Sequence, residues 1–221
     1  GVISGAFNLN KTYAGSITLS GANNYTGNTT VTDGTLQAGV ATVLNNGAVV
    51  SGAFGVNSAV TVNGGTLALG TFSNTIGSLA GGAAVTVGTG ATLSIGTLNT
   101  NTTFSGSLTG AGAVAKIGTG TLTFNTDKRY TGGTTVNAGT LVLNDVYDDG
   151  YGVLVGTLNV NASGTVQLAG GTAALGWNTD RVTTLNINGG LVESLTGTSQ
   201  HIWNMTGGVN FSGGGELRTN G

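Results

Sequence analysis

A seventeen-residue stretch occurs twice in this chain. Residues 23–39 read NNYTGNTTVTDGTLQAG, and residues 128–144 read KRYTGGTTVNAGTLVLN. The two copies align without gaps at an offset of 105 residues, and the match extends upstream, where Lys11 meets Lys116. A shared bias toward Gly and Thr would not bring lysines and tyrosines into one register. The fold must therefore accommodate the same long unit twice.

A shorter unit runs inside the long one. It consists of an aliphatic residue, two small or polar residues, Gly, Thr and a second aliphatic residue. Units of this kind begin at Val31, Val62, Ile117 and Val136, and versions one residue longer begin at Val87 and Val160. Successive starts are 19 to 31 residues apart. Periods of about 20–50 residues are typical of solenoids and propellers.

The local pattern favours the solenoid. Apolar residues alternate with others on both sides of a Gly/Asn corner, as at Val60, Val62, Leu67 and Leu69. Such alternation predicts short strands with one buried face, and Gly or Asn suits corners that need a positive φ. Propeller blades need longer strands and motifs such as Trp-Asp, which this chain lacks.

We therefore expect an all-β fold, a right-handed parallel β-helix (β-solenoid) of roughly nine coils that forms a single segment over residues 1–221. Neighbouring coils should lie about 4.8 Å apart. Ladders of Thr and Asn on the wet faces should keep the surface soluble with little charge.

The composition supports a folded chain and excludes several kinds of partner. Charged residues are 6% and hydrophobic residues 38%, with a net charge of −2, which is too apolar and too neutral for a disordered segment. The six Lys and Arg residues are scattered, so no nucleic-acid partner is expected. The absence of Cys removes disulfides and thiolate sites. No run approaches the ~20 apolar residues of a membrane span, so no membrane insertion is expected.

The repeat resembles a known family. The pattern N-x-Y-T-G-x-T-T-V-x-x-G-T-L, preceded by G-x-I/L-x-G-x-x-x-x-x-K, is similar to the passenger-associated transport repeat of bacterial autotransporters. It covers about 1–38 and 106–143, although Asp127, Lys128 and Arg129 replace the usual Gly-Ala-Asn in the second copy. The resemblance implies an extracellular β-helical stalk delivered by type V secretion or a related route, and it leaves the activity of the passenger open.

Residues with catalytic or metal-binding chemistry are sparse. His201 is the only histidine, and no G-x-S-x-G elbow accompanies it, which favours a loop or interface residue. The stretch 110–115 imitates a dinucleotide-binding fingerprint but lies inside a repeat unit. Asp145, Asp148 and Asp149 form the densest carboxylate cluster and could bind Ca²⁺. Their spacing fits no Ca²⁺ loop and favours a solvated insertion.

The region from Leu175 to Trp203 departs most from the repeat. It gathers aromatic and charged residues that form either a partner surface or the core of an irregular coil: Trp177, Asp180, Arg181, Glu193, His201 and Trp203. A polysaccharide-acting enzyme would need paired carboxylates on one face, and Asp180, Glu193 and Glu216 cannot be placed on a common face from the sequence. We predict no catalytic, cofactor-binding or metal-binding residues and no cofactor.

The expected function is a non-enzymatic extracellular stalk or fibre segment of a bacterial surface or secreted protein. Two alternatives remain open: an adhesin that binds a cell-surface partner through a lateral face, and a polysaccharide-acting β-helix enzyme. Open strand edges at both ends predict either further coils of a longer chain or end-to-end stacking of copies. In both cases residues 1 and 106 are expected to begin equivalent coils.

Overall fold

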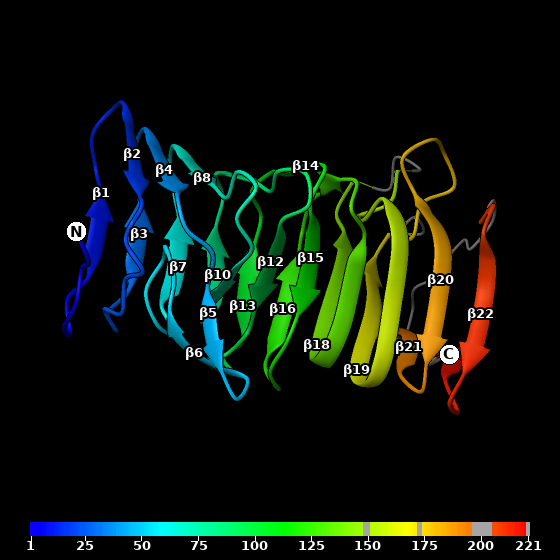
Figure 1. Ribbon diagram of the computed structural model, residues 1–221. Helices are drawn as coiled ribbons and strands as arrows, with labels where there is room; N and C mark the ends of the chain where they lie inside the picture. Colours follow the sequence, from blue (N-terminus) through cyan, green and yellow to red (C-terminus); the bar gives the residue numbers. More distant parts are fainter. Residues whose placement is uncertain (148–150, 172–173, 196–204, 220–221) are drawn as a thin grey trace.

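The computed structural model describes residues 1–147, 151–171, 174–195 and 205–219. Every regular element in these ranges is a β-strand (Figure 1). Within the same ranges, no helix has the length and apolar character needed to cross a bilayer. The strands are β1 (Leu9–Lys11), β2 (Ser16–Leu19), β3 (Thr29–Val31), β4 (Thr35–Ala38), β5 (Val43–Asn45), β6 (Ala48–Ser51), β7 (Ala59–Val62), β8 (Thr66–Ala68), β9 (Asn74–Ile76), β10 (Ser78–Gly81), β11 (Ala84–Thr86), β12 (Thr92–Ile95), β13 (Thr102–Phe104), β14 (Leu108–Gly110), β15 (Ala113–Lys116), β16 (Thr121–Phe124), β17 (Arg129–Tyr130), β18 (Thr134–Asp145), β19 (Gly156–Gly170), β20 (Val182–Asn188), β21 (Leu191–Ser194), β22 (Gly208–Ser212) and β23 (Glu216–Thr219).

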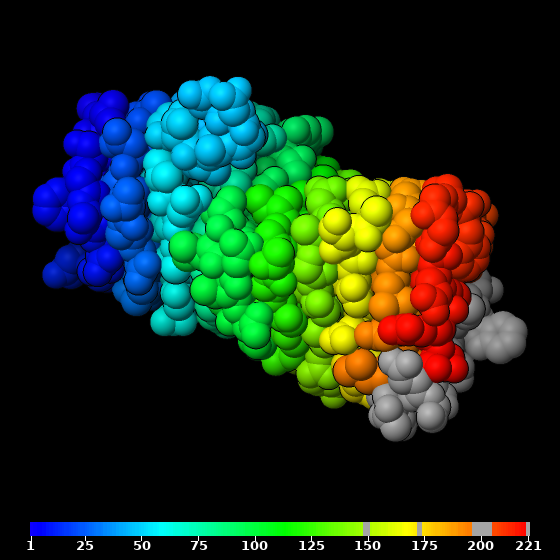
Figure 2. Space-filling view, turned by 90° about the horizontal axis from the view of Figure 1, so that it is seen from below, coloured from blue at the N-terminus to red at the C-terminus, as the bar shows by residue number. Residues whose placement is uncertain are grey.

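The strands stack in chain order along one axis, so that successive coils appear as bands of colour along a rod (Figures 1 and 2). One ladder of parallel partners climbs from Lys11 to Thr219 in nine steps of 19 to 31 residues. It passes through Val31, Val62, Gly81, Phe104, Phe124, Leu143, Leu168 and Ser194. The predicted all-β parallel β-helix of roughly nine coils is confirmed.

The coils of the N-terminal half run along three faces, and strands occupy the third face from β9 onward. The first face holds β1, β3, β7, β10, β13 and β16, the second holds β2, β4, β8, β11, β14 and β17, and the third holds β9, β12 and β15. Further along, β18 and β19 run across the corner between the third and first faces. They join these two faces into one 15-stranded sheet, which ends with β20 and β22 on the third face and β21 and β23 on the first.

Inward-facing ladders of apolar side chains fill the interior. On the second face Leu36, Leu67, Val85 and Leu108 stack in register and are buried. On the first face, Leu141 is buried between partners on the coils before and after it. Leu36 and Leu141 therefore both point into the core, as the alternation of the repeat predicts.

The two repeat copies nevertheless lie on different faces. Lys11 belongs to β1 on the first face, whereas Lys116 belongs to β15 on the third. Five steps up the ladder from Lys11 lead to Phe124 on the first face, whereas 105 residues from Lys11 lead to Lys116 on the third face. An offset of 105 residues is therefore one face short of five full coils. The prediction that residues 1 and 106 begin equivalent coils is wrong. The unit specifies two strands and a corner, and any corner of the prism with similar sides can accept it.

Both repeat lysines take the place of an aliphatic residue in an inward ladder. Lys116 aligns with Ile95 and Val136, and its side chain is buried. Its Nζ donates to three corner carbonyls at 2.7, 2.9 and 3.2 Å, those of Ile117, Gly118 and Ala138. Lys11 Nζ donates to the equivalent carbonyls of Tyr13 and Asp33. Each lysine therefore ties the corners of two successive coils together, and burial lowers the pKa of Lys116 to about 8.

The corner glycine of the repeat is left-handed in both copies, with φ of +62° at Gly34 and +66° at Gly139. A Cβ on Gly139 would lie 2.5 Å from the carbonyl oxygen of Gly118, whereas a Cβ on Gly90, at φ +77°, would meet nothing within 4 Å. We expect Gly90→Ala to cost about 1–2 kcal/mol for the backbone conformation alone. Gly139→Ala should cost clearly more in chemical denaturation, and equal losses would contradict the close approach of the coils.

The outer surface of the third face carries the predicted polar ladders. Asn186 Nδ2 donates to Asn159 Oδ1 at 2.8 Å, and Asn210 Nδ2 donates to Asn186 Oδ1 at 2.8 Å. A second row connects Asn161 to Asn137 at 2.7 Å. Amide groups of one kind, one coil apart, hydrogen-bond along the axis, which explains a polar surface with little charge.

Candidate functional site

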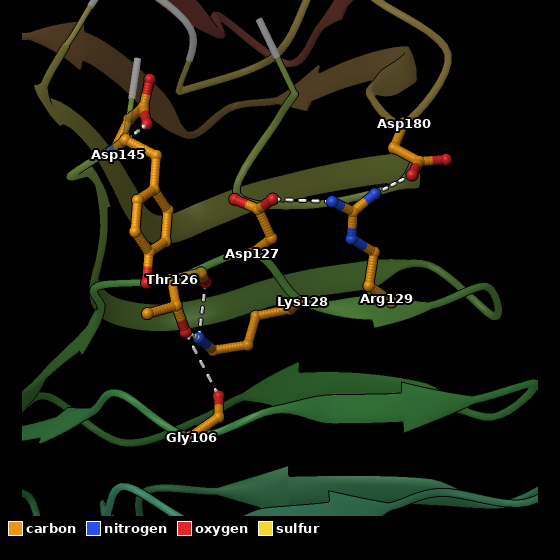
Figure 3. Close-up of polar contacts among 8 residues, drawn as sticks. Gly106, Thr126, Asp127, Lys128, Arg129, Asp145 and Asp180 are labelled. Carbon is orange, nitrogen blue, oxygen red and sulfur yellow. Dashed lines mark hydrogen bonds and ion pairs between the residues drawn. The ribbon is translucent and has the colours of Figure 1, made fainter. Parts of the chain in front are cut away.

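Three stretches that depart from the repeat meet beside the second face in the C-terminal half (Figure 3). They are residues 127–129, the described residues 145–147 and 151–153, and the turn at Asp180. Backbone hydrogen bonds bring them together, from Lys128 N to Val153 O at 2.8 Å and from Gly152 N to Asp180 O at 2.7 Å. In the sequence these stretches are separate departures from the repeat, and it is the coiling of the chain that places them side by side.

Arg129 is the centre of this arrangement. Its Nη2 donates to Asp127 Oδ2 at 2.8 Å, and its Nη1 forms an ion pair with the carboxylate of Asp180. The guanidinium also lies 5.1 Å from the centroid of the Tyr151 ring. A planar guanidinium can hold two carboxylates and stack on a ring at once, which an ammonium cannot do. Arg129 thus connects its own coil to the turn at Asp180. We refer to Asp127, Lys128, Arg129, Tyr151 and Asp180 as the Arg129 cluster.

Lys128 lies beneath the ion pairs, inside the core. It directly precedes β17 on the second face, and its Nζ lies 5.5 Å from the ring centroid of Phe104 and 5.1 Å from that of Phe124. The ammonium donates to the carbonyl oxygen of Thr126 at 2.5 Å and to its Oγ1 at 2.6 Å. Burial lowers the pKa of Lys128 to about 7, and the charge of Asp127 only partly opposes this.

The first repeat copy shows what Lys128 replaces. The equivalent residue is Asn23, which is also buried and whose Nδ2 donates to the carbonyl oxygen of Ala53 at 2.8 Å. Both copies therefore place a buried hydrogen-bond donor before the tyrosine of the repeat. That tyrosine also has the same role in both copies. Tyr25 and Tyr130 are buried; Tyr25 hydrogen-bonds Thr29 at 2.6 Å, and Tyr130 hydrogen-bonds Thr134 at 2.5 Å.

Exposed apolar and aromatic residues occur next to the cluster along the chain. Tyr147 is 62% exposed and Trp177 is 45% exposed, and Val146 is also exposed. Asp145 is buried instead, and its Oδ1 accepts a hydrogen bond from the backbone N of Tyr147 at 3.1 Å. The part of the expected solvated insertion that the structure describes therefore begins with a buried carboxylate that orders the backbone.

The other acidic candidates lie elsewhere. Glu193 is on the first face, where it accepts from Gln167 Nε2 at 2.9 Å and from Arg218 Nη2 at 3.0 Å. Glu216 lies one coil further on, 3.7 Å from the same arginine. Neither joins Asp180. Asp148, Asp149, His201 and Trp203 lie outside the described residues. Among the residues that are described, no group of three His, Cys, Asp or Glu side chains could hold a metal ion.

Sequence reasoning missed the burial of Lys128 and the pairing of Arg129 with Asp180. A signal for the first was available, because Lys128 aligns with Asn23 at a position that precedes the buried tyrosine in both copies. No local signal pointed to the second. Gly110 ends β14 and residues 113–115 lie in β15, so the likeness of this stretch to a dinucleotide fingerprint comes from the repeat.

A parallel β-helix built on this repeat defines the class of bacterial autotransporter passengers. The family model for the passenger-associated-transport-repeat matches residues 9–38 and 114–143. The chain is also 37% identical over 228 residues to the Adhesin BmaC autotransporter of Brucella suis biovar 1 (strain 1330). That match covers 99% of this chain and 6% of the relative, so the chain spans only a small part of that protein. The chain thus carries the passenger-associated-transport-repeat and is similar along nearly its whole length to part of an autotransporter, and both findings indicate a location outside the cell or on its outer surface.

Proposed function

We propose that the chain is a non-enzymatic stalk segment of an extracellular autotransporter passenger. The observation that carries this proposal is the unbroken ladder of nine parallel steps from Lys11 to Thr219. At about 4.8 Å per step, the ladder spans roughly 43 Å. A stack in which each coil contacts only its neighbours can extend along its axis without any change of design. Such a rod spaces other parts of the passenger away from the cell.

The Arg129 cluster supports a structural role over catalysis. Arg129 forms ion pairs with both Asp127 and Asp180. A glycosidase needs one carboxyl group protonated as its general acid and a second one ionised. Two carboxylates that share one guanidinium favour the opposite arrangement, in which both are ionised.

We also propose that the outermost described coils pair with further coils. Among the described residues, strands β1 and β2 at one end and β22 and β23 at the other have a partner strand on one side only. Apolar side chains are exposed at both ends, among them Phe7, Ile17 and Phe211. Further coils of one longer polypeptide fit the small share of the relative that the chain spans. The alternative, stacking of copies, is a heterologous contact with no upper limit. It would appear in sedimentation as species larger than dimers.

An adhesive role is the second candidate, because exposed Tyr147 and Trp177 adjoin the Arg129 cluster and the relative is named an adhesin. The two candidates differ in what the isolated segment binds. As a stalk, it should bind neither host cells nor a glycan array above background. As an adhesin, it should bind, and Tyr147→Ser should abolish the signal. Tyr13→Ser is the matched control, since Tyr13 is exposed on the first coil, far along the rod.

A further inference from the structure

One coil carries a projecting hairpin, visible as the light-blue protrusion in Figure 2. Strands β5 and β6 are antiparallel and are joined by Asn46 and Gly47, with φ of 48° and 81°. Positive φ at both central residues is the signature of the tight hairpin turn that suits twisted strands. The insertion explains why the step from Val31 to Val62 takes 31 residues, whereas the other eight steps take 19 to 26.

Buried amides hold the base of this hairpin. Asn23 Nδ2 donates to Ala53 O at 2.8 Å, Ala53 N donates to Asn74 Oδ1 at 3.1 Å, and Asn74 Nδ2 donates to Val40 O at 3.1 Å. Asn74 occupies a ladder position that Leu93 fills one coil further on. Two buried polar side chains thus satisfy the backbone where the chain leaves and re-enters the coil, so the projection has a fixed root.

Among the described residues, the outer edge of the hairpin is bonded to the rest of the chain at its base alone, where the backbone N of Thr42 donates to Ser73 O at 2.9 Å. Strands β5 and β6 form a two-stranded sheet of their own, and all three residues of β5 are exposed, with Leu44 at 55% and Val43 at 46%. Native edge strands usually avoid pairing by means of charges, Pro or a covering segment. No charged residue occurs between Gly34 and Ala115, and the chain contains no Pro. Beyond Thr42, the edge at Val43–Asn45 is therefore open to the addition of another strand.

We propose that the β5 edge pairs with β5 of a second copy of this chain. The two strands would run antiparallel about a two-fold axis near Leu44, which gives a four-stranded sheet in the order β6, β5, β5 of the second copy and β6 of the second copy. Two identical uncharged edges meet without repulsion, and Leu44 packs against its own counterpart. Such an isologous contact closes at two copies.

Because the edge is short, its pairing favours a partner held at high local concentration, such as a second copy, over a partner free in dilute solution. A three-residue strand buries far less than the roughly 1,200 Å² of a standard stable interface, so pairing has to be weak. Weak contacts form when the partners are held close together, and tethered partners reach effective concentrations in the ~mM range. Copies of a passenger carried on one bacterial surface meet that condition.

The test uses the 221-residue protein in sedimentation equilibrium up to about 1 mM, the range set by the effective concentration of tethered partners. We expect a reversible equilibrium between monomer and dimer with no larger species. Leu44→Lys and Leu44→Glu should each be monomeric, because they place like charges at the two-fold axis. An equal mixture of the two variants should dimerise again, since each Lys then meets a Glu. Ile17→Lys, at the exposed end strand β2, should dimerise like the unmodified protein.

The charge-swap mixture separates this contact from a mere loss of folding, because two misfolded variants would not restore each other. A monomer throughout the concentration range overturns the proposal. So does Leu44→Lys that dimerises normally, or a mixture that stays monomeric. Species that grow beyond dimers and disappear with Ile17→Lys would assign the association to the ends of the rod, and the hairpin contact would again be wrong. The stalk proposal is unaffected by any of these outcomes.

Discussion

Leu141→Ala should lower the free energy of unfolding by about 2–5 kcal/mol, the cost of a cavity in a packed core. Leu141 is buried on the first face between Leu122 on the preceding coil and Val166 on the following one. The backbone hydrogen bonds hold these neighbours at the spacing of the coils, about 4.8 Å. Because the neighbours cannot collapse into the space, most of the cavity should persist. Chemical denaturation measures the loss.

Two further variants serve as controls for the effect of Leu141→Ala. Val142→Thr changes the next residue, which lies on the outer side of the same strand, and should alter stability by no more than about 0.5 kcal/mol. Leu36→Ala changes the same position of the first repeat copy, on a different face of the prism, and should cost about as much as Leu141→Ala. A loss below roughly 0.5 kcal/mol for Leu141→Ala would show that the register is wrong.

Lys128→Met should raise the free energy of unfolding at neutral pH. The ammonium of Lys128 is buried against Phe104 and Phe124, and its pKa falls from 10.5 in the unfolded chain to about 7 in the folded protein. Below pH 7 the folded protein bears the full cost of the buried charge. Between pH 7 and 10.5 the folded protein loses the proton while the unfolded chain keeps it, so stability rises with pH. At ~1.4 kcal/mol per pK unit, the cost amounts to several kcal/mol.

The measurement is the free energy of unfolding of both proteins at pH 6, 8 and 9.5. The difference between them should shrink as the pH rises. Lys116 adds its own rise, because its pKa is also lowered, but it is present in both proteins and cancels. Lys116→Met is the matched control and should not stabilise, since it removes a donor from three corner carbonyls. A stability difference that does not change with pH would show that Lys128 is not a buried, titrating group.

Much of the fold could be predicted because its rules are local. Alternation with a period of two placed Leu36, Leu67 and Leu141 inside, and the structure confirms all three. The corner glycines were predicted from their need for a positive φ, which Gly34 and Gly139 show. These features depend only on residues a few positions apart. The hairpin at Asn46 and Gly47 was not predicted, although Asn-Gly between apolar stretches is a strong turn signal.

The sequence by itself determined the repeated strand-and-corner unit, the inward ladders, the parallel β-helix and its likeness to the repeats of autotransporter passengers. The tertiary structure alone decided which face each unit occupies and which distant residues meet. Lys116 lies one face away from where the offset of 105 residues suggested, and Arg129 meets Asp180 two coils later. The physical reason is that position around the axis depends on the summed lengths of all preceding sides and insertions. A pattern of a few residues does not contain the summed lengths of the preceding sides, whereas these lengths fix the position of each residue in the hydrogen-bonded stack of coils.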